Sequence, residues 1–276
     1  MSAPTAAERP GIGRLSAMTA ILAGEWLKLR SLRATRVILG VVAAAVLAVA
    51  ALAWHVANLW DGLPPDQRGH LRVAELDLVV SLPVQLCMAV LGVLAVTSEY
   101  GTGMIRASLV AVPQRRALLA AKAAVVAAVA LVVGLAALFG TFFAGKLILG
   151  DRPVAGYGAP LSDRLPMLFA SALSVLVFAV VGLGVAAVAR SALGVSSVVV
   201  ALVYVLPMIA INLPKPWSDR VYSLLLPALP GQLAESGYAG IPYTGILPPP
   251  GALAVLVAYL ALPLGAAIVL IHRRDV

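Results

Sequence analysis

The chain alternates between long apolar stretches and short segments that carry its charged residues. Six stretches hold about 20 residues or more without Asp, Glu, Lys or Arg, which is the length an α-helix needs to cross a hydrocarbon core. They comprise residues 37–57, 78–97, 123–145, 165–189, 192–213 and 251–271. The pattern predicts an all-α, polytopic integral membrane protein with six transmembrane helices over residues 37–276.

The fourth and fifth stretches are separated only by Arg190 and its neighbours. One straight helix from 165 to 213 would be about 74 Å long, far more than a bilayer is thick. We therefore expect a tight turn at Arg190, Ser191 and Gly194.

Composition agrees with a membrane protein. Of the 276 residues, 62% are hydrophobic and 12% are charged, which leaves too little polar surface for a water-soluble protein of this size. The net charge of +8 does not indicate a nucleic-acid partner, because no stretch supplies a basic face on a folded polar domain. The single cysteine and three isolated histidines predict no disulfide within the chain and no metal site.

The basic residues are distributed unevenly between the two sides of the predicted membrane. The termini and the segments on their side carry thirteen Lys and Arg residues, and the opposite segments carry seven. Because cytoplasmic segments are enriched in Lys and Arg, both termini are expected in the cytoplasm.

The segment before the first span has two parts. Residues 1–13 are expected to be disordered, and residues 14–36 to form a cytoplasmic amphipathic helix in the plane of the membrane. The apolar stripe of this helix would contain Leu15, Met18, Leu22, Trp26 and Leu29. The alternative is a short basic lead-in to the first span.

No pattern predicts catalysis. The sequence lacks the G-x-x-x-x-G-K-[ST] phosphate loop, the H-E-x-x-H zinc pair and the G-x-S-x-G nucleophile turn, so we expect no catalytic residue and no cofactor. The spans contain no ionisable Asp, Glu, Lys or Arg that could hold a coupling ion. An intramembrane enzyme remains a minor alternative, and it would need an activated serine. The candidates are Ser171, Ser174, Ser196 and Ser197.

The segment 98–122, between the second and third spans, is unusually rich in charge. A short helix ending near Pro113 could lie across the cytoplasmic mouth and dock on another protein through charged side chains. These are Glu99, Arg106, Arg115 and Arg116. The alternative is that the arginines only contact lipid headgroups.

This segment resembles the loop between spans two and three in the membrane subunit of ABC-2 type transporters. The pattern E-x3-G-x2-R-x6-P-x2-R-x5-K is formed by Glu99, Gly103, Arg106, Pro113, Arg116 and Lys122. The run from Glu25 to Ser31 is similar to the elbow helix of that family, with Glu25, Trp26, Lys28 and Arg30 as its polar and aromatic positions. The turn at Arg190 and the basic tail are similar as well.

The resemblance implies a permease subunit in a bacterial inner membrane that pairs with a second permease subunit and docks a separate ATP-hydrolysing subunit. Residues Glu99 to Arg116 would then couple ATP hydrolysis to the spans, and the chain itself would not be an enzyme. Uncharged spans suit export of a hydrophobic or amphipathic substrate. The alternative is a membrane anchor or assembly subunit that does not transport.

Eight prolines interrupt the moderately apolar segment 214–250 and exclude long helices there. The family resemblance implies short helices that dip back from the outer face. A plain extracellular loop is the alternative.

Overall fold

A computed structural model of the chain describes residues 12–68, 71, 75–101, 115–154, 159–189, 192–236 and 246–273. Helices dominate these residues. The long ones are α1 (Ile12–Ser31), α2 (Arg33–Gly62), α4 (Leu76–Gly101), α6 (Arg115–Leu149), α7 (Leu161–Ala189) and α12 (Pro249–Arg273). The short ones are α3 (Pro65–Arg68), α8 (Ala192–Val200), the π-helix η1 (Ala201–Val205), α9 (Leu206–Ile211), α10 (Trp217–Leu224), the 3-10 turn η2 (Leu226–Ala228) and α11 (Leu229–Leu233).

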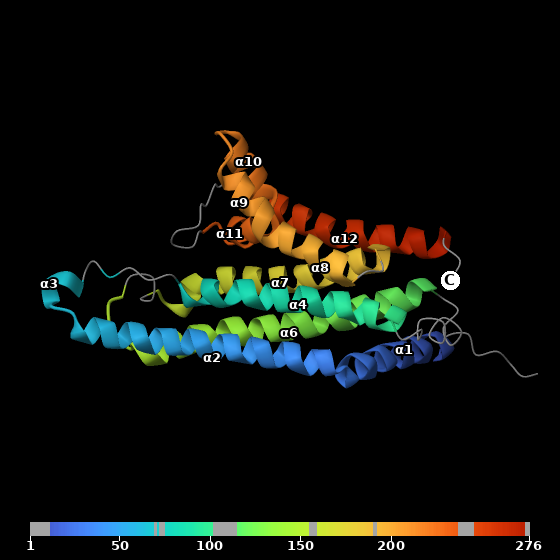
Figure 1. Cartoon of the computed structure of the whole chain (residues 1–276), viewed down its shortest axis with the longest axis horizontal. Helices are drawn as coiled ribbons and strands as arrows, with labels where there is room; N and C mark the ends of the chain where they lie inside the picture. The colour runs from blue at the N-terminus through green and yellow to red at the C-terminus, as the bar shows by residue number, and fades with distance from the viewer. Residues whose placement is uncertain are drawn as a thin grey trace, which may run out of the picture.

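The long helices form an elongated bundle. Helices α2, α4, α6 and α7 lie side by side along its long axis, and α12 runs along α7 on the side away from α2 (Figure 1). Buried residues make up 72% of the most apolar part of α7 but only 22% and 11% of those of α2 and α12. Helix α7 is therefore the centre of the bundle, and α2 and α12 present apolar side chains outward.

Glycines allow α4 and α7 to approach until their backbones touch. A Cβ built on Gly92 would lie 1.9 Å from the carbonyl oxygen of Ala179, and one built on Gly182 would lie 2.3 Å from the carbonyl oxygen of Ala89. Small residues at such a seam are the usual way for membrane helices to pack, since burial among lipid tails gives no hydrophobic drive to associate.

Five described helices are long and apolar enough to cross a membrane, namely α2, α4, α6, α7 and α12. The stretch predicted as the fifth of six spans is also helical, but it is divided into α8, η1 and α9, with a π-helical turn in its middle. The all-helical, membrane-type architecture is thus confirmed, and the sixth crossing stays a prediction.

In the proline-rich segment after α9, residues 217–233 form the short helices α10, η2 and α11, whereas residues 237–245 lie outside the described part of the chain. Helix α11 packs against α7 and α12 with Leu229 fully buried, and Leu226 of the preceding η2 is fully buried as well. Helix α10 instead packs on α9 through Tyr222, which is buried beside Ala210. The chain therefore turns back towards the bundle before α12 begins.

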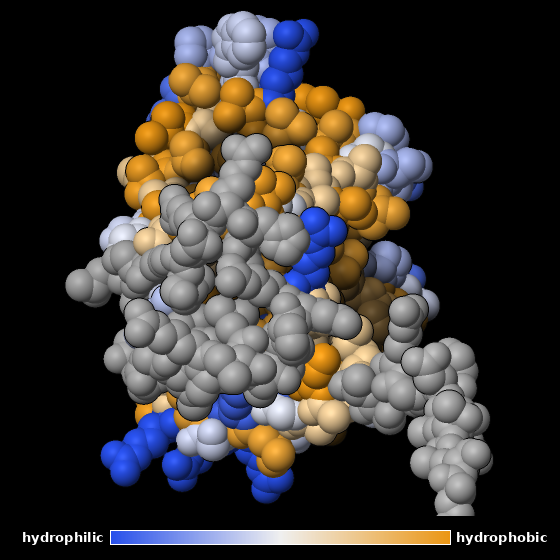
Figure 2. All heavy atoms as spheres, turned by 90° about the vertical axis from the view of Figure 1, so that its right-hand side faces the viewer, coloured by the Kyte–Doolittle hydropathy of each residue, from blue (hydrophilic) through white to orange (hydrophobic). Residues whose placement is uncertain are grey.

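One end of the bundle gathers several chain segments that are distant in sequence. Helix α1, the last turn of α4, the first turns of α6 and the end of α12 all lie there (Figure 1). Viewed from that end, hydrophobic residues dominate the upper part of the molecule, and hydrophilic residues gather along its lower edge (Figure 2). The predicted disordered residues 1–13 fall almost wholly outside the described part of the chain, as do Arg190 and Ser191 of the predicted turn.

Candidate functional site

Helix α1 places two charged side chains on the face that packs against the bundle. Residues three and four apart lie on the same helix face, so Glu25, Lys28 and Leu29 point together. Glu25 and Leu29 are both buried, and α1 packs against α6. Thr35 fixes the junction with α2, because its hydroxyl donates a hydrogen bond of 2.7 Å to the carbonyl oxygen of Leu29.

The two flanks of the predicted coupling segment meet this face of α1. Glu99 lies in the last turn of α4, and Lys122 lies in the second turn of α6. Lys122 Nζ is 2.8 Å from Glu99 Oε1, so a salt bridge joins the two residues that flank the segment. The same ammonium group also donates a hydrogen bond to Glu25 Oε2.

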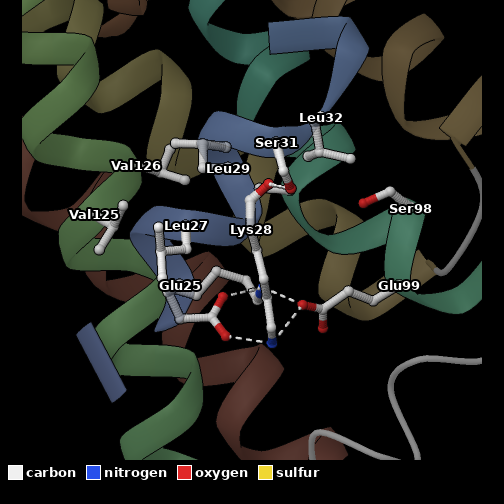
Figure 3. Close-up of a pocket in the computed structure, with 12 residues that line it drawn as sticks. Glu25, Leu27, Lys28, Leu29, Ser31, Leu32, Ser98, Glu99, Val125 and Val126 are labelled. Carbon is white, nitrogen blue, oxygen red and sulfur yellow. Dashed lines mark hydrogen bonds and ion pairs between the residues drawn. The ribbon is translucent and has the colours of Figure 1, made fainter. Parts of the chain in front are cut away.

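Lys28 completes a network of four charges. Its Nζ lies 2.7 Å from Glu25 Oε1 and 3.1 Å from Glu99 Oε1 (Figure 3). We call Glu25, Lys28, Glu99 and Lys122 the junction network. It joins α1, α4 and α6 with two positive and two negative charges, so it is neutral as a whole.

The junction network is shielded from solvent. Glu25, Glu99 and Lys122 are 4%, 2% and 7% exposed, whereas the side chain of Lys28 is 30% exposed. Burial by itself lowers the pKa of Lys28, but the hydrogen bonds to Glu25 and Glu99 outweigh burial and raise that pKa above its ordinary value. Lys28 is therefore protonated throughout the physiological pH range.

A cavity of about 410 Å³ adjoins the network. Its polar lining consists of the four charged residues together with Ser31 and Ser98, and the rest of its lining is apolar (Figure 3). The apolar wall residues are Leu27, Leu29, Leu32, Ala95, Val125 and Val126. Among the described residues, no donor reaches Glu99 Oε2, although this oxygen is buried.

The predicted site residues divide into three groups. Glu25, Lys28 and Glu99 come together in the junction network. Arg116, Trp26 and Arg30 lie at the same end of the bundle and are exposed. Gly103, Arg106 and Pro113 lie outside the described residues, as does the side chain of Arg115.

The apolar stripe predicted for α1 is only partly the packing face. Leu29 is buried against the bundle, whereas Met18 and Trp26 are exposed. The rotation of α1 instead brings Glu25 inward, because this carboxylate meets the buried ammonium group of Lys122. The sequence analysis assigned Lys122 to the family pattern but did not predict its pairing with Glu25. The only signal for this pairing was two opposite charges at the ends of apolar runs.

A second ionic group lies at the opposite end of the bundle. Arg164 at the start of α7 binds both oxygens of Asp77 at 3.0 Å and also pairs with Glu75, next to the start of α4. Nearby, Arg152 and Asp61 form an exposed pair through two hydrogen bonds of 2.8 and 2.9 Å. The central helices are therefore tied by charges at both ends and by apolar contacts between them.

The described residues include the potential metal ligands of the chain's helices and Ser174, one of the four candidate serines. Across these parts of the chain, His, Cys, Asp and Glu do not gather in groups of three or more that could hold a metal ion. The hydroxyl of Ser174 accepts a hydrogen bond of 3.4 Å from the side-chain amide of Gln85. An amide is not a general base, so this contact does not activate the serine.

Long apolar helices with ionic groups at their two ends define a multi-pass α-helical membrane protein. A family model described as "ABC-2 family transporter protein" matches residues 21–208, which extend from α1 into α9. The chain belongs to this ABC-2 family of transporter proteins, whose members are membrane components that work with an ATP-binding subunit. The matched range contains the whole junction network. No curated protein sequence matches the chain significantly.

Proposed function

We propose that the chain is the permease subunit of an ABC-2 type exporter in a bacterial plasma membrane, coupled to a separate ATPase subunit at the end of the bundle where α1 lies. Six spans, counting α8 to α9 as one, would form half of the pathway, and a second permease subunit would complete it. The cargo would be hydrophobic or amphipathic, because the apolar spans offer no charged group to bind an ionic substrate.

The observation that carries this proposal is the contact between Glu99 and Lys122. These residues flank the predicted coupling segment, and both are also bound to α1 through Glu25 and Lys28. A push on the segment would therefore move α1, α4 and α6 together. Flanking residues that are linked to each other and to α1 suit a segment that transmits force from a soluble partner to the membrane helices.

The role of α1 as an elbow helix has similar support. Helix α1 meets α2 at Leu32, where the backbone leaves helical geometry with a ψ of 125°. Trp26 and Arg30 are exposed next to this bend, where an aromatic ring and a guanidinium group suit the headgroup layer. We infer that α1 lies along the cytoplasmic interface while its opposite face holds the junction network.

A second permease subunit would have an apolar surface to cover. The exposed face of α8, η1 and α9 is apolar over most of its length and includes Val198, Val205, Met208 and Ile209. An open groove of about 480 Å³ runs along its end between Tyr204 and Leu213. Lipid would cover this face in an anchor that does not transport.

Reversal of one charge tests the coupling role. Arg116 is exposed in the first turn of α6, next to the predicted segment. We expect Arg116→Glu to weaken co-purification of the ATPase subunit about tenfold or more, because like charges placed across an interface repel each other. The measurement is the ratio of ATPase to permease recovered from mildly solubilised membranes.

The matched control is Arg33→Glu, an equal charge change at an exposed position at the start of α2. Arg33→Glu should leave the recovered ratio unchanged, and both variants should insert into the membrane normally. Equal loss in the two variants would mean that only the overall basic charge matters. Unchanged recovery with Arg116→Glu would favour the anchor or assembly role.

The orientation of the chain in the membrane can be tested separately. Ser31 and Ser162 are exposed at opposite ends of the bundle, and Cys87 is the only native cysteine. In a Cys87→Ala background, a maleimide that cannot cross membranes should label Ser162→Cys in intact cells. It should label Ser31→Cys only after permeabilisation. The opposite pattern would place α1 outside and overturn the proposed coupling site.

A further inference from the structure

We propose that the cavity beside the junction network binds the headgroup of a bilayer lipid that carries a primary ammonium group, of the phosphatidylethanolamine type. The ammonium group would donate a hydrogen bond to the Glu99 carboxylate once a small shift of this side chain turns the buried Oε2 towards the cavity, and the upper parts of the acyl chains would lie along the apolar walls. This site goes beyond the proposed transport function, because it requires neither nucleotide nor cargo.

The unpaired oxygen Oε2 of Glu99 indicates which charge and which hydrogen-bonding groups the ligand carries. Glu99 Oε1 accepts from both Lys28 and Lys122, while no donor in the described chain reaches the buried Oε2. A buried acceptor without a donor is costly, and a charged donor offers the strongest compensation. The site therefore favours a ligand that brings N–H groups and a positive charge.

The lysines of the network do not offer a competing site for an anion. The ammonium group of Lys122 already contacts two carboxylates, and that of Lys28 contacts the same two. An anion would have to displace a carboxylate from a neutral buried cluster. A zwitterionic headgroup instead places its ammonium at Glu99 and leaves its phosphate near the partly exposed side of Lys28.

The walls and the location indicate an amphiphile rather than a soluble amine. Six aliphatic side chains, from α1, the α1–α2 junction, α4 and α6, line the cavity, so a fully polar ligand would leave apolar surface in contact with water. A volume of about 410 Å³ is in the range of small-ligand sites and accommodates a headgroup with only part of its chains. Leu27 is 61% exposed at the rim, which gives the chains an apolar route towards the bilayer.

The test is a lipid titration followed by native mass spectrometry. The full chain, purified in detergent, is titrated with palmitoyl-oleoyl phosphatidylethanolamine, phosphatidylcholine or phosphatidylglycerol. Phosphatidylcholine keeps the charge and the tails but has no N–H donor, so we expect it to bind about tenfold more weakly than phosphatidylethanolamine. Equal binding of the two, or stronger binding of anionic phosphatidylglycerol, would overturn the proposal.

Two variants locate the binding. Glu99→Gln removes the carboxylate and should abolish the preference for phosphatidylethanolamine. Val125→Phe leaves all four charges in place and fills the cavity from its half-buried wall, so it should weaken phosphatidylethanolamine binding about tenfold even if Glu99→Gln does not fold. Unchanged binding in Val125→Phe would exclude this cavity as the site.

The matched control is Glu75→Gln, which changes a buried carboxylate of the ionic group at the other end of the bundle. It should retain the phosphatidylethanolamine preference. Loss of that preference in Glu75→Gln would mean that the preference reflects general stability and would overturn the assignment. Octadecylamine serves as a second probe, and tighter binding of this amine than of phosphatidylethanolamine would identify a transported amphiphile rather than a bilayer lipid as the ligand.

Discussion

Replacement of Lys122 by methionine is expected to destabilise the folded chain by about 3–5 kcal/mol. The substitution keeps the length of the side chain but leaves Glu25 and Glu99 buried with only Lys28 between them. Removal of one partner from a buried ion network costs much more than the net value of the pair, because the remaining charges stay desolvated. The free energy of unfolding in detergent, measured by denaturant titration, gives the size of the effect.

The control lies on the same helix. Lys146 is exposed near the other end of α6, where its ammonium group lies 5.6 Å from the centre of the Phe142 ring. Lys146→Met should cost about 1 kcal/mol or less, as is usual for an exposed cation over an aromatic ring. An equal cost for the two lysines would show that the junction network contributes nothing special. If Glu25→Gln partly restores the stability of Lys122→Met, the loss of stability comes from the buried carboxylate that has lost its partner.

Addition of one methyl group at Gly92 should have an effect of similar size. Gly92→Ala would place a carbon atom within 1.9 Å of the backbone oxygen of Ala179, and neither backbone can move away without separating α4 from α7. Overpacking of a core typically costs about 1–3 kcal/mol and occasionally more, and a clash with backbone belongs at the upper end. We expect a large drop in thermal stability and little properly folded protein.

Gly140→Ala on α6 is the matched control, since a Cβ there meets nothing within 4 Å. Alanine is the better helix former by roughly 0.5–1 kcal/mol, so this variant should be as stable as the parent or slightly more stable. Folding yield and melting temperature of the two variants, measured side by side, decide the matter. A tolerated Gly92→Ala would show that the α4–α7 seam is looser than its geometry indicates.

The helices of the bundle were predictable because their signal is physical and local. A stretch such as 165–189 has no charged residue, and in a bilayer its backbone groups can be satisfied only within a helix. The helix α7 that contains it begins and ends near the predicted limits. The π-helical turn η1 was not predictable, since the residues Ala201–Val205 are as apolar as their neighbours and contain no proline or glycine.

The contacts within the junction network could not be predicted from the sequence. Each charged residue could be assigned to one end of a span, because hydrocarbon excludes charge, but Glu25 and Lys122 are 97 positions apart. Their contact depends on how α1 rotates about its axis after it meets α6. The apolar pattern of α1 predicted that Trp26 would lie on the buried face. In the structure the buried face instead contains Glu25, which pairs with Lys122, and Trp26 is exposed.

The close seam between α4 and α7 has a mechanical consequence. Two helices whose backbones interlock at Gly92 and Gly182 cannot slide past each other without a steric collision, so they move as a single rigid lever. Glu99 lies at one end of this lever, and the Arg164 ion group lies at the other. A tilt imposed at the first end would therefore be delivered to the far side of the bundle as a displacement, with no relay of rearranging side chains between them.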